Sequence, residues 1–244
     1  MIAADQPTIF PMDIVVRVSS AGDGTMLDRT KGVHTPEAVA NRRRFCETVG
    51  VDYKDVVYQQ IIYDEKQTYK DLKFVDKTST SRITSEVHAD SLITAQTGVG
   101  IMLPIADCVA TVVYDPGTRQ LAVLHLGRHS TVTSLLPDTI KRMIEHGSNI
   151  EDILVWMCPS AQQKSYVLEY FDQADHDDWK PFCTQKSDGV HVDLVGYNRQ
   201  VCLDAGIPAK NIEVSPIDTF TSNDYFSHSR GDTTKRFVVL AIMH

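Results

Sequence analysis

A cysteine and a histidine stand at the two ends of a pair of apolar runs in the segment PIADCVATVVYDPGTRQLAVLHLGRHST, residues 104–131. The Asp-Pro-Gly-Thr turn between the runs predicts a β-hairpin. If this hairpin is symmetric about its Pro-Gly pair, Cys108 lies directly opposite His125 on one face. A thiolate and an imidazole at that separation can share a metal ion or a proton, so this pair is the candidate centre of a site.

Two site chemistries would use this pair, although a buried Cys or a strand-end His alone is more typical of core packing. In the first, Cys108 and His125 bind Zn²⁺ together with a third protein ligand, and an open position activates water. In the second, His125 deprotonates Cys108 for covalent catalysis. Asp107 either orients a ligand, handles a proton or caps a turn. The candidate third ligands are His129, His88 and His228.

Strands and helices that interleave along the chain must position these residues. The patterns predict strands at 14–19, 56–63, 92–94, 99–103, 153–158 and 236–244, and helices at 36–50, 131–147 and 193–205, with Pro137 kinking or restarting the second helix. We interpret 21–24 as a turn, 64–81 as a loop or flap, and 159–190 as irregular. Because the strands include a hairpin, we expect an α/β mixed (α+β) fold, a mixed β-sheet layered with helices, in a single domain of residues 1–244.

The composition excludes several classes of function. The 244 residues are 42% hydrophobic, which is enough for a sizeable core, and carry a net charge of −8. This charge gives no electrostatic basis for binding nucleic acid or anionic membranes, and we expect the basic run Arg42–Arg44 to lie on a solvated face. No signal peptide, membrane span or CxxC pair is apparent, which favours a cytoplasmic protein with free thiols. The oligomeric state is not predicted.

Motifs in a shared order resemble the multicopper polyphenol oxidase (laccase-domain) family. The segments 89-ADSLIT-94 and 106-ADC-108, followed by His125-Leu126-Gly127, are similar to the family's A-D-A-L-V-T, T-A-D-C and H-A-G-W-R-G. Three further segments resemble its S-T-R-x-G-G, Asn-Arg helix and F-F-S-x-R-R…G-R motifs. These are Val18-Ser19-Ser20 with Gly24, residues 36–42, and Tyr225-Phe226-Ser227 with Arg230, Lys235 and Arg236.

The resemblance implies a mixed α/β fold with one site, in which a Cys and two His hold zinc. It also implies phosphorolysis of adenosine, inosine or methylthioadenosine and deamination of adenosine, while a bacterial branch edits peptidoglycan precursors. Cys108 and His125 match the family's metal positions, and Ser19, Arg128 and Arg230 are candidate substrate-binding residues. The older laccase label implies copper, but the nine histidines include no His-x-His pair, so copper is not expected.

Three chemically demanding positions depart from the family pattern. The family's other His, in Q-V-H-G, falls on Ile62, and the Arg of S-T-R-x-G-G falls on Ala21. The family's Trp-Arg-Gly falls on residues 128–130, Arg-His-Ser. Ile cannot ligate zinc, and a lost Arg removes a bidentate phosphate partner. We therefore expect these changes to impair phosphorolysis more than nucleoside binding.

Three hypotheses follow from these residues. The first is a metal-assisted enzyme acting on purine nucleosides, with Cys108, His125 and Asp107 as catalytic residues and His129 or His88 completing the zinc ligands. The second is a catalytically degenerate relative that binds a small molecule or a partner. The third is a Cys/His hydrolase that needs no metal.

Overall fold

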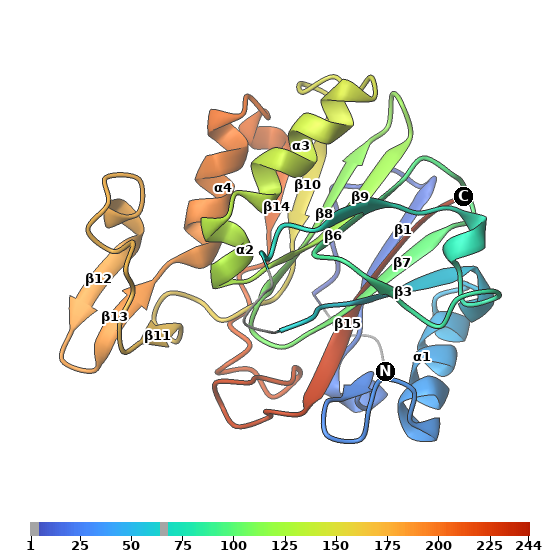
Figure 1. Cartoon of the computed structure of the whole chain (residues 1–244), viewed down its shortest axis with the longest axis horizontal. Coiled ribbons are helices and arrows are strands. Elements are labelled where there is room, and N and C mark those ends of the chain that lie inside the picture. Colours follow the sequence, from blue (N-terminus) through green and yellow to red (C-terminus); the bar gives the residue numbers. More distant parts are fainter. Residues whose placement is uncertain (1–4, 64–67) are drawn as a thin grey trace.

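The computed structural model describes residues 5–63 and 68–244 (Figure 1). Its helices are α1 (Pro36–Thr48), α2 (Arg128–Val132), α3 (Leu135–Glu145) and α4 (Leu194–Asp204), with short 3₁₀ turns η1 (Ala21–Asp23), η2 (Tyr53–Asp55), η3 (Lys77–Ser79), η4 (Lys180–Phe182) and η5 (Ala209–Asn211). Its strands are β1 (Ile14–Val18), β2 (Leu27–Asp28), β3 (Val56–Gln60), β4 (Leu72–Phe74), β5 (Val87–His88), β6 (Ser91–Thr94), β7 (Gly100–Ile105), β8 (Val109–Asp115), β9 (Gln120–Leu126), β10 (Leu154–Met157), β11 (Val167–Leu168), β12 (Cys183–Lys186), β13 (Gly189–Val192), β14 (Ile212–Val214) and β15 (Lys235–Met243).

The described residues form two six-stranded sheets and one three-stranded sheet. The first runs β1-β15-β7-β3-β5, with β2 beside β15, and the second runs β14-β10-β8-β9-β6-β4. Strand β3 is parallel to β7 and β10 is parallel to β14, whereas β1, β15 and β7 are antiparallel and so are β8 and β9. Parallel and antiparallel pairing within both large sheets confirms the predicted mixed α+β class, although the strands divide into two layers rather than one.

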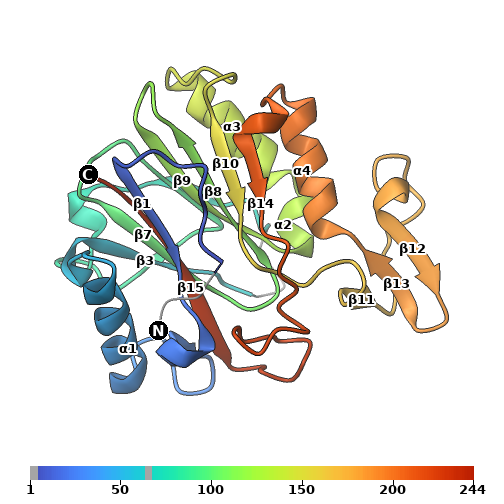
Figure 2. The ribbon, with the colours of Figure 1, turned by 180° about the vertical axis from the view of Figure 1, so that it is seen from behind.

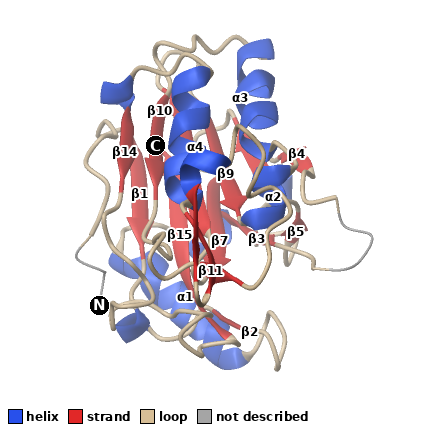
Figure 3. Ribbon diagram, turned by 90° about the vertical axis from the view of Figure 1, so that its left-hand side faces the viewer, coloured by secondary structure: helices blue, strands red, loops and turns tan. Residues whose placement is uncertain are grey.

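The two large sheets pack face to face between two helical layers (Figures 1 and 2). Alternate residues of β7, β8 and β15, such as Ile101, Val112 and Val239, fill the space between the sheets. The outer face of the second sheet packs on α3 and α4, and the outer face of the first packs on α1. The side view shows α1 and α3 at opposite ends of this stack (Figure 3). Within the described residues, no helix is long and apolar enough to span a bilayer.

Local sequence signals explain where the helices begin and end. The Thr35 hydroxyl accepts a hydrogen bond from Ala38 N at 3.2 Å and starts α1, while the Asp193 carboxylate does the same for Gly196 N at 2.8 Å and starts α4. The predicted helix 131–147 is instead two helices, because Ser134 adopts a left-handed φ of 66°. Pro137 then sits in the first turn of α3, where its missing N–H costs nothing.

The β8–β9 hairpin has a different register from the one predicted. Ala110, not Cys108, pairs with His125, and the last pair is Asp115 with Gln120. The turn is longer because the Asp115 carboxylate accepts from Gly117 N at 2.8 Å and Arg119 adopts a φ of 54°. The prediction of direct opposition was therefore wrong. The shift is two residues, however, so every side chain stays on the predicted face.

Two other sequence expectations need correction. Residues 159–190, expected to be irregular, contain β11, β12 and the first half of β13, and these strands form an arm beyond the main body (Figure 1). Within 64–81, residues 64–67 lie outside the described residues, but β4 adds a parallel strand beside β6. Arg42 is fully buried rather than solvated, whereas Arg43 and Arg44 are exposed.

Candidate functional site

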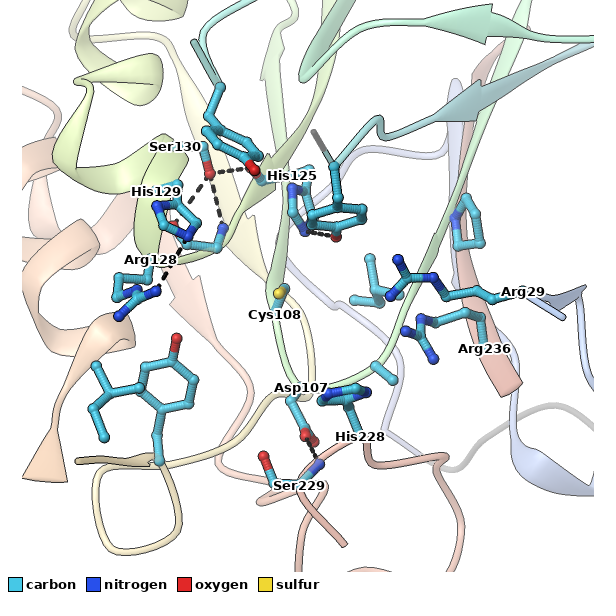
Figure 4. Close-up of a pocket in the computed structure, with 18 of the residues that line it drawn as sticks. Arg29, Asp107, Cys108, His125, Arg128, His129, Ser130, His228, Ser229 and Arg236 are labelled. Carbon is cyan, nitrogen blue, oxygen red and sulfur yellow. Dashed lines mark hydrogen bonds between the residues drawn. The ribbon is translucent and has the colours of Figure 1, made fainter. Parts of the chain in front are cut away.

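A pocket of about 430 Å³ opens at the side of the molecule where β7 and β9 end and where β8 and β15 begin (Figure 4). Its lining combines aromatic rings, basic side chains and the Cys-His pair of the hairpin. The polar and aromatic lining residues are Arg29, Tyr63, Tyr69, Asp107, Cys108, His125, Arg128, His129, Ser130, Tyr166, His228, Ser229 and Arg236. A concave site of this size and mixed chemistry is typical of small-molecule binding.

Cys108 and His125 meet in this pocket despite the shifted register. Cys108 lies two residues before Ala110, the partner of His125, so the two side chains are diagonal neighbours on one face. They converge above Gly127, where a methyl group would lie 3.2 Å from His125 Cε1 and 3.3 Å from Cys108 Sγ. The absence of a side chain at Gly127 therefore leaves room for both reactive groups.

Burial controls the charge of this pair. It raises the pKa of the Cys108 thiol to about 12, with Asp107 adding to the shift, and lowers the pKa of His125 to about 4, with the charge of Arg236 adding to that shift. By themselves the two groups are thus a neutral thiol and a neutral imidazole at pH 7. A metal-free cysteine hydrolase needs a thiolate beside an imidazolium, so these shifts do not favour that hypothesis.

Tyr63 is a pocket residue that the sequence analysis missed. Its hydroxyl lies 3.2 Å from His125 Nε2, and the two rings meet edge to face with centroids 6.0 Å apart (Figure 4). Burial raises the pKa of this phenol, so it stays protonated at pH 7. Tyr63 lies three residues after the end of β3 and next to Ile62, the position matched to the family's second His, which is the signal that pointed to this segment.

Two positive charges line the pocket (Figure 4). Arg29 comes from the turn after β2, and Arg236 comes from β15. The Arg29 guanidinium lies 4.8 Å from the centre of the Tyr63 ring. Arg236 is buried, and its Nη1 donates to the carbonyls of Asp232, Thr233 and Lys235. Burial and Arg29 both lower the pKa of Arg236. Among the described residues, neither guanidinium has a carboxylate within 4.0 Å.

Arg128 and His129 form another wall of the pocket at the start of α2. Arg128 Nη2 lies 3.2 Å from His129 Nε2, and the His129 ring stacks on Tyr69 with centroids 4.7 Å apart. Burial and the neighbouring Arg128 lower the pKa of His129. The structure therefore brings these two predicted residues to the pocket, with His129 packed against an aromatic ring.

Asp107 lines the pocket but holds the surrounding loops together. Its carboxylate accepts from Thr219 Oγ1 and from Ser229 N, each at 2.7 Å, and its backbone has a left-handed φ of 74°. The 219–229 loop also carries His228 into the pocket. Both oxygens of Asp107 are thus engaged by the protein, which favours a positioning role.

The structure does not bring Ser19, Arg230 or His88 to the pocket. Ser19 is buried where β1 meets β15, and its hydroxyl accepts from Val238 N at 3.0 Å. Arg230 donates to the Thr219 and Tyr225 carbonyls and to Asp232. His88 is exposed on β5, with Nε2 3.2 Å from Glu86.

The side chains in the pocket do not complete the zinc centre that the resemblance implies. Cys108 and His125 offer one sulfur and one nitrogen, whereas a catalytic zinc needs three protein ligands. Ile62 lines the adjoining pocket rather than this one. Among residues 5–63 and 68–244, no three His, Cys, Asp or Glu side chains are grouped closely enough to hold a metal ion.

The fold and this pocket define an α+β protein with a Cys-His pair at the open end of a β-hairpin. Residues 26–244 match the family model described as multi-copper polyphenol oxidoreductase laccase, and the chain belongs to this family. The solved structure of YlmD from Geobacillus stearothermophilus has the same fold, with a TM-score of 0.80 over 99% of this chain and 97% of that one, at 23% identity.

Relatives in this family carry the names of nucleoside enzymes. A purine nucleoside phosphorylase of Bacteroides thetaiotaomicron is 32% identical over 148 residues, which cover 58% of this chain and 55% of that protein. An adenosine deaminase named RL5, from an unknown prokaryotic organism, is 28% identical over 170 residues, covering 67% of this chain and 65% of that protein. Each match thus spans less than two thirds of the relative's own length.

Proposed function

We propose that this pocket binds a purine nucleoside together with inorganic phosphate and cleaves the glycosidic bond by phosphorolysis. The observation that carries the proposal is the pair Arg29 and Arg236, which face an aromatic pocket without a carboxylate partner among the described residues. Two guanidinium groups this close repel each other unless an anion lies between them. Phosphate accepts bidentate hydrogen bonds from such groups.

The remaining lining suits a purine and a ribose. The pocket volume of about 430 Å³ lies in the range of small-ligand sites, and Tyr63, Tyr69 and Tyr166 contribute ring faces and hydroxyl groups. A flat base gains about 1–3 kcal/mol by stacking on such a ring. Arg29 also compensates in part for the family Arg that is replaced by Ala21, because it supplies a guanidinium from another loop.

The reaction follows from holding the two substrates together. A phosphate oxygen forms a bond to ribose C1′ while the bond from C1′ to the purine nitrogen breaks, and the electron pair leaves with the base. The base then takes up a proton from a lining hydroxyl or from solvent. The arginines orient the phosphate beside the nucleoside, so the chain's own contribution is orientation and charge.

A non-catalytic nucleoside-binding protein is the second candidate, and Ile62 favours it. This residue replaces a metal ligand of the family, so the pocket keeps its shape and cations while losing one reactive group. Adenosine deamination is a further outcome that the name of one relative suggests. It requires an activated water and yields inosine, so its product differs from that of phosphorolysis.

Chromatographic assays of inosine and adenosine, each with and without phosphate, separate these candidates. Phosphorolysis releases the free base only when phosphate is present, and deamination converts adenosine to inosine with or without it. If no product forms while inosine still binds, the protein is a binder. At phosphate concentrations below its KM, substituting Arg236 with Gln should reduce the phosphate-dependent release about tenfold or more, whereas Arg43→Gln, at an exposed position on α1, should leave it unchanged.

A further inference from the structure

The residues that follow β3 in this chain differ from the family's metal-binding pattern. The chain leaves β3 at Gln60, and the family resemblance places its second metal-binding His two residues later, at Ile62. Ile62 lines the adjoining pocket only, whereas the next residue, Tyr63, lines both that pocket and the one that holds Cys108 and His125. The end of this strand thus presents a phenol where an imidazole is expected.

The Tyr63 phenol lies beside Nε2 of His125, while the other ring nitrogen, Nδ1, is buried with no hydrogen-bond partner among the described residues. Tyr63 Oη is 3.2 Å from His125 Nε2, a hydrogen-bond distance, and the ring lies edge-on to the imidazole. The nitrogen thereby has a partner within the protein. A metal ion bound through Nε2 would have to displace this hydroxyl. A neutral phenol is not among the usual protein ligands of zinc, so Tyr63 does not supply the missing third ligand.

The surroundings also oppose a divalent cation. Arg29 and Arg236 line the same pocket, and Arg29 lies over the Tyr63 ring at 4.8 Å. Two fixed positive charges repel a dication in a partly buried site. The nearest other imidazole of α2, His129, is stacked on Tyr69 and hydrogen-bonded to Arg128. His228 lines the pocket as well, but among the described residues no three His, Cys, Asp or Glu side chains are grouped closely enough to hold a metal ion.

We infer that this family member carries no resident zinc, and that the Tyr63 hydroxyl occupies the ligand position beside His125. A hydrogen-bonded Tyr-His pair replaces a metal-His bond, and the pocket keeps its cationic side chains to attract an anionic co-substrate. The inference concerns the same pocket as the proposed function. Metal binding is measured without any nucleoside, so the two proposals can fail separately.

The test measures zinc in the untagged full chain after incubation with one equivalent of zinc and gel filtration. Elemental analysis gives zinc per chain, and competition with a chromophoric zinc indicator gives the affinity. We expect far less than one zinc per chain in the wild type. We expect Tyr63→His to bind zinc at least about 100-fold more tightly, because it adds a third ligand beside Cys108 and His125.

Ile62→His is the matched control, since it adds the same imidazole one residue earlier, in the adjoining pocket. It should leave the zinc affinity within about threefold of the wild type, and Cys108→Ser should remove the gain made by Tyr63→His. Circular dichroism checks that each variant folds. The inference is overturned if the wild type holds about one zinc per chain that Cys108→Ser removes. It is also overturned if Tyr63→His gains no more affinity than Ile62→His.

Discussion

Single side chains set the character of the pocket. Gly127 leaves the space in which Cys108 and His125 meet, and Arg29 and Arg236 supply positive charge without a carboxylate partner among the described residues. Tyr63, Tyr69 and Tyr166 line the pocket beside these groups. Substitutions at the glycine and at the arginines therefore probe different parts of the proposed function.

Gly127→Ala tests whether the Cys-His centre is part of the binding site. The added methyl group would lie 3.2–3.3 Å from both side chains, while the backbone φ of −92° accepts any residue. We expect the affinity for inosine to fall at least about tenfold, with a change in stability below about 1.5 kcal/mol. Isothermal titration calorimetry measures the first and urea unfolding the second.

Gly22→Ala is the control for this change, because its methyl group would make an ordinary contact 3.4 Å from the Ser20 hydroxyl, outside the pocket. Unchanged inosine affinity in Gly127→Ala would contradict the placement of the nucleoside beside Cys108 and His125.

Arg29→Gln and Arg236→Gln test the phosphate site. Each charged hydrogen-bond partner contributes about 1.5–3 kcal/mol, so the KM for phosphate should rise about tenfold to hundredfold in either variant. Inosine affinity in the absence of phosphate should change less than about threefold. Arg29→Lys keeps the charge without the forked geometry and should lie between the wild type and Arg29→Gln. An equal loss of inosine affinity in both Gln variants would show that the arginines support the pocket rather than bind the anion.

At the scale of elements, the sequence predicted the strands and helices that carry strong local signals. Capping residues and glycines marked α1 and α4, and alternation along β8 and β9 identified the inner face of the hairpin. The turn register depended on the side chain of Asp115 and on Arg119, which the Pro-Gly motif does not reveal. The strands of the β11–β13 arm are only two to four residues long, so its sequence lacks a clear period.

Most of the predicted residues that line the pocket are close together in sequence, and His228 is the exception. Cys108, His125, Arg128 and His129 all belong to the hairpin and the helix that follows it. Arg29, Tyr63 and Arg236 come from distant segments, and only the packing of β3, β7 and β15 brings them to the same end of the sheets. Arg230 is a candidate substrate-binding residue in the sequence, yet its guanidinium donates hydrogen bonds to backbone carbonyls of the protein.

The anchoring of α1 can be tested through Arg42. Its fully buried guanidinium donates to the carbonyls of Val33 and Ala38 and lies 4.0 Å from the centre of the Tyr58 ring. Arg42→Ala removes these hydrogen bonds and the packing on Tyr58 from a fully buried position, so we expect a loss of about 2–4 kcal/mol in the free energy of unfolding. Exposed Arg43→Ala on the same helix should cost less than about 0.5 kcal/mol. Equal effects in urea unfolding would show that Arg42 does not anchor the helix.

The whole molecule is a four-layer stack in which the sheets share one core. Strands from the beginning, middle and end of the chain alternate within the first sheet, since β15 lies between β1 and β7. No part of that sheet can therefore form without the others. This topology explains why the pocket, at the end of both sheets, depends on the complete fold.

Calorimetry tests this cooperativity and the single-domain expectation together. We expect one thermal transition for the full chain. A nucleoside with phosphate at about 100 times its dissociation constant should add about 2.7 kcal/mol to the free energy of unfolding. Two separate transitions, only one of them shifted by ligand, would show that residues 1–244 contain more than one domain.

The most direct test of the account is a calorimetric titration of inosine into the metal-stripped protein, with and without saturating phosphate. The account predicts one saturable site per chain in both conditions, with tighter binding when phosphate is present and loss of that phosphate effect in Arg236→Gln. An absence of saturable inosine binding in either condition would contradict the assignment of this pocket to a purine nucleoside.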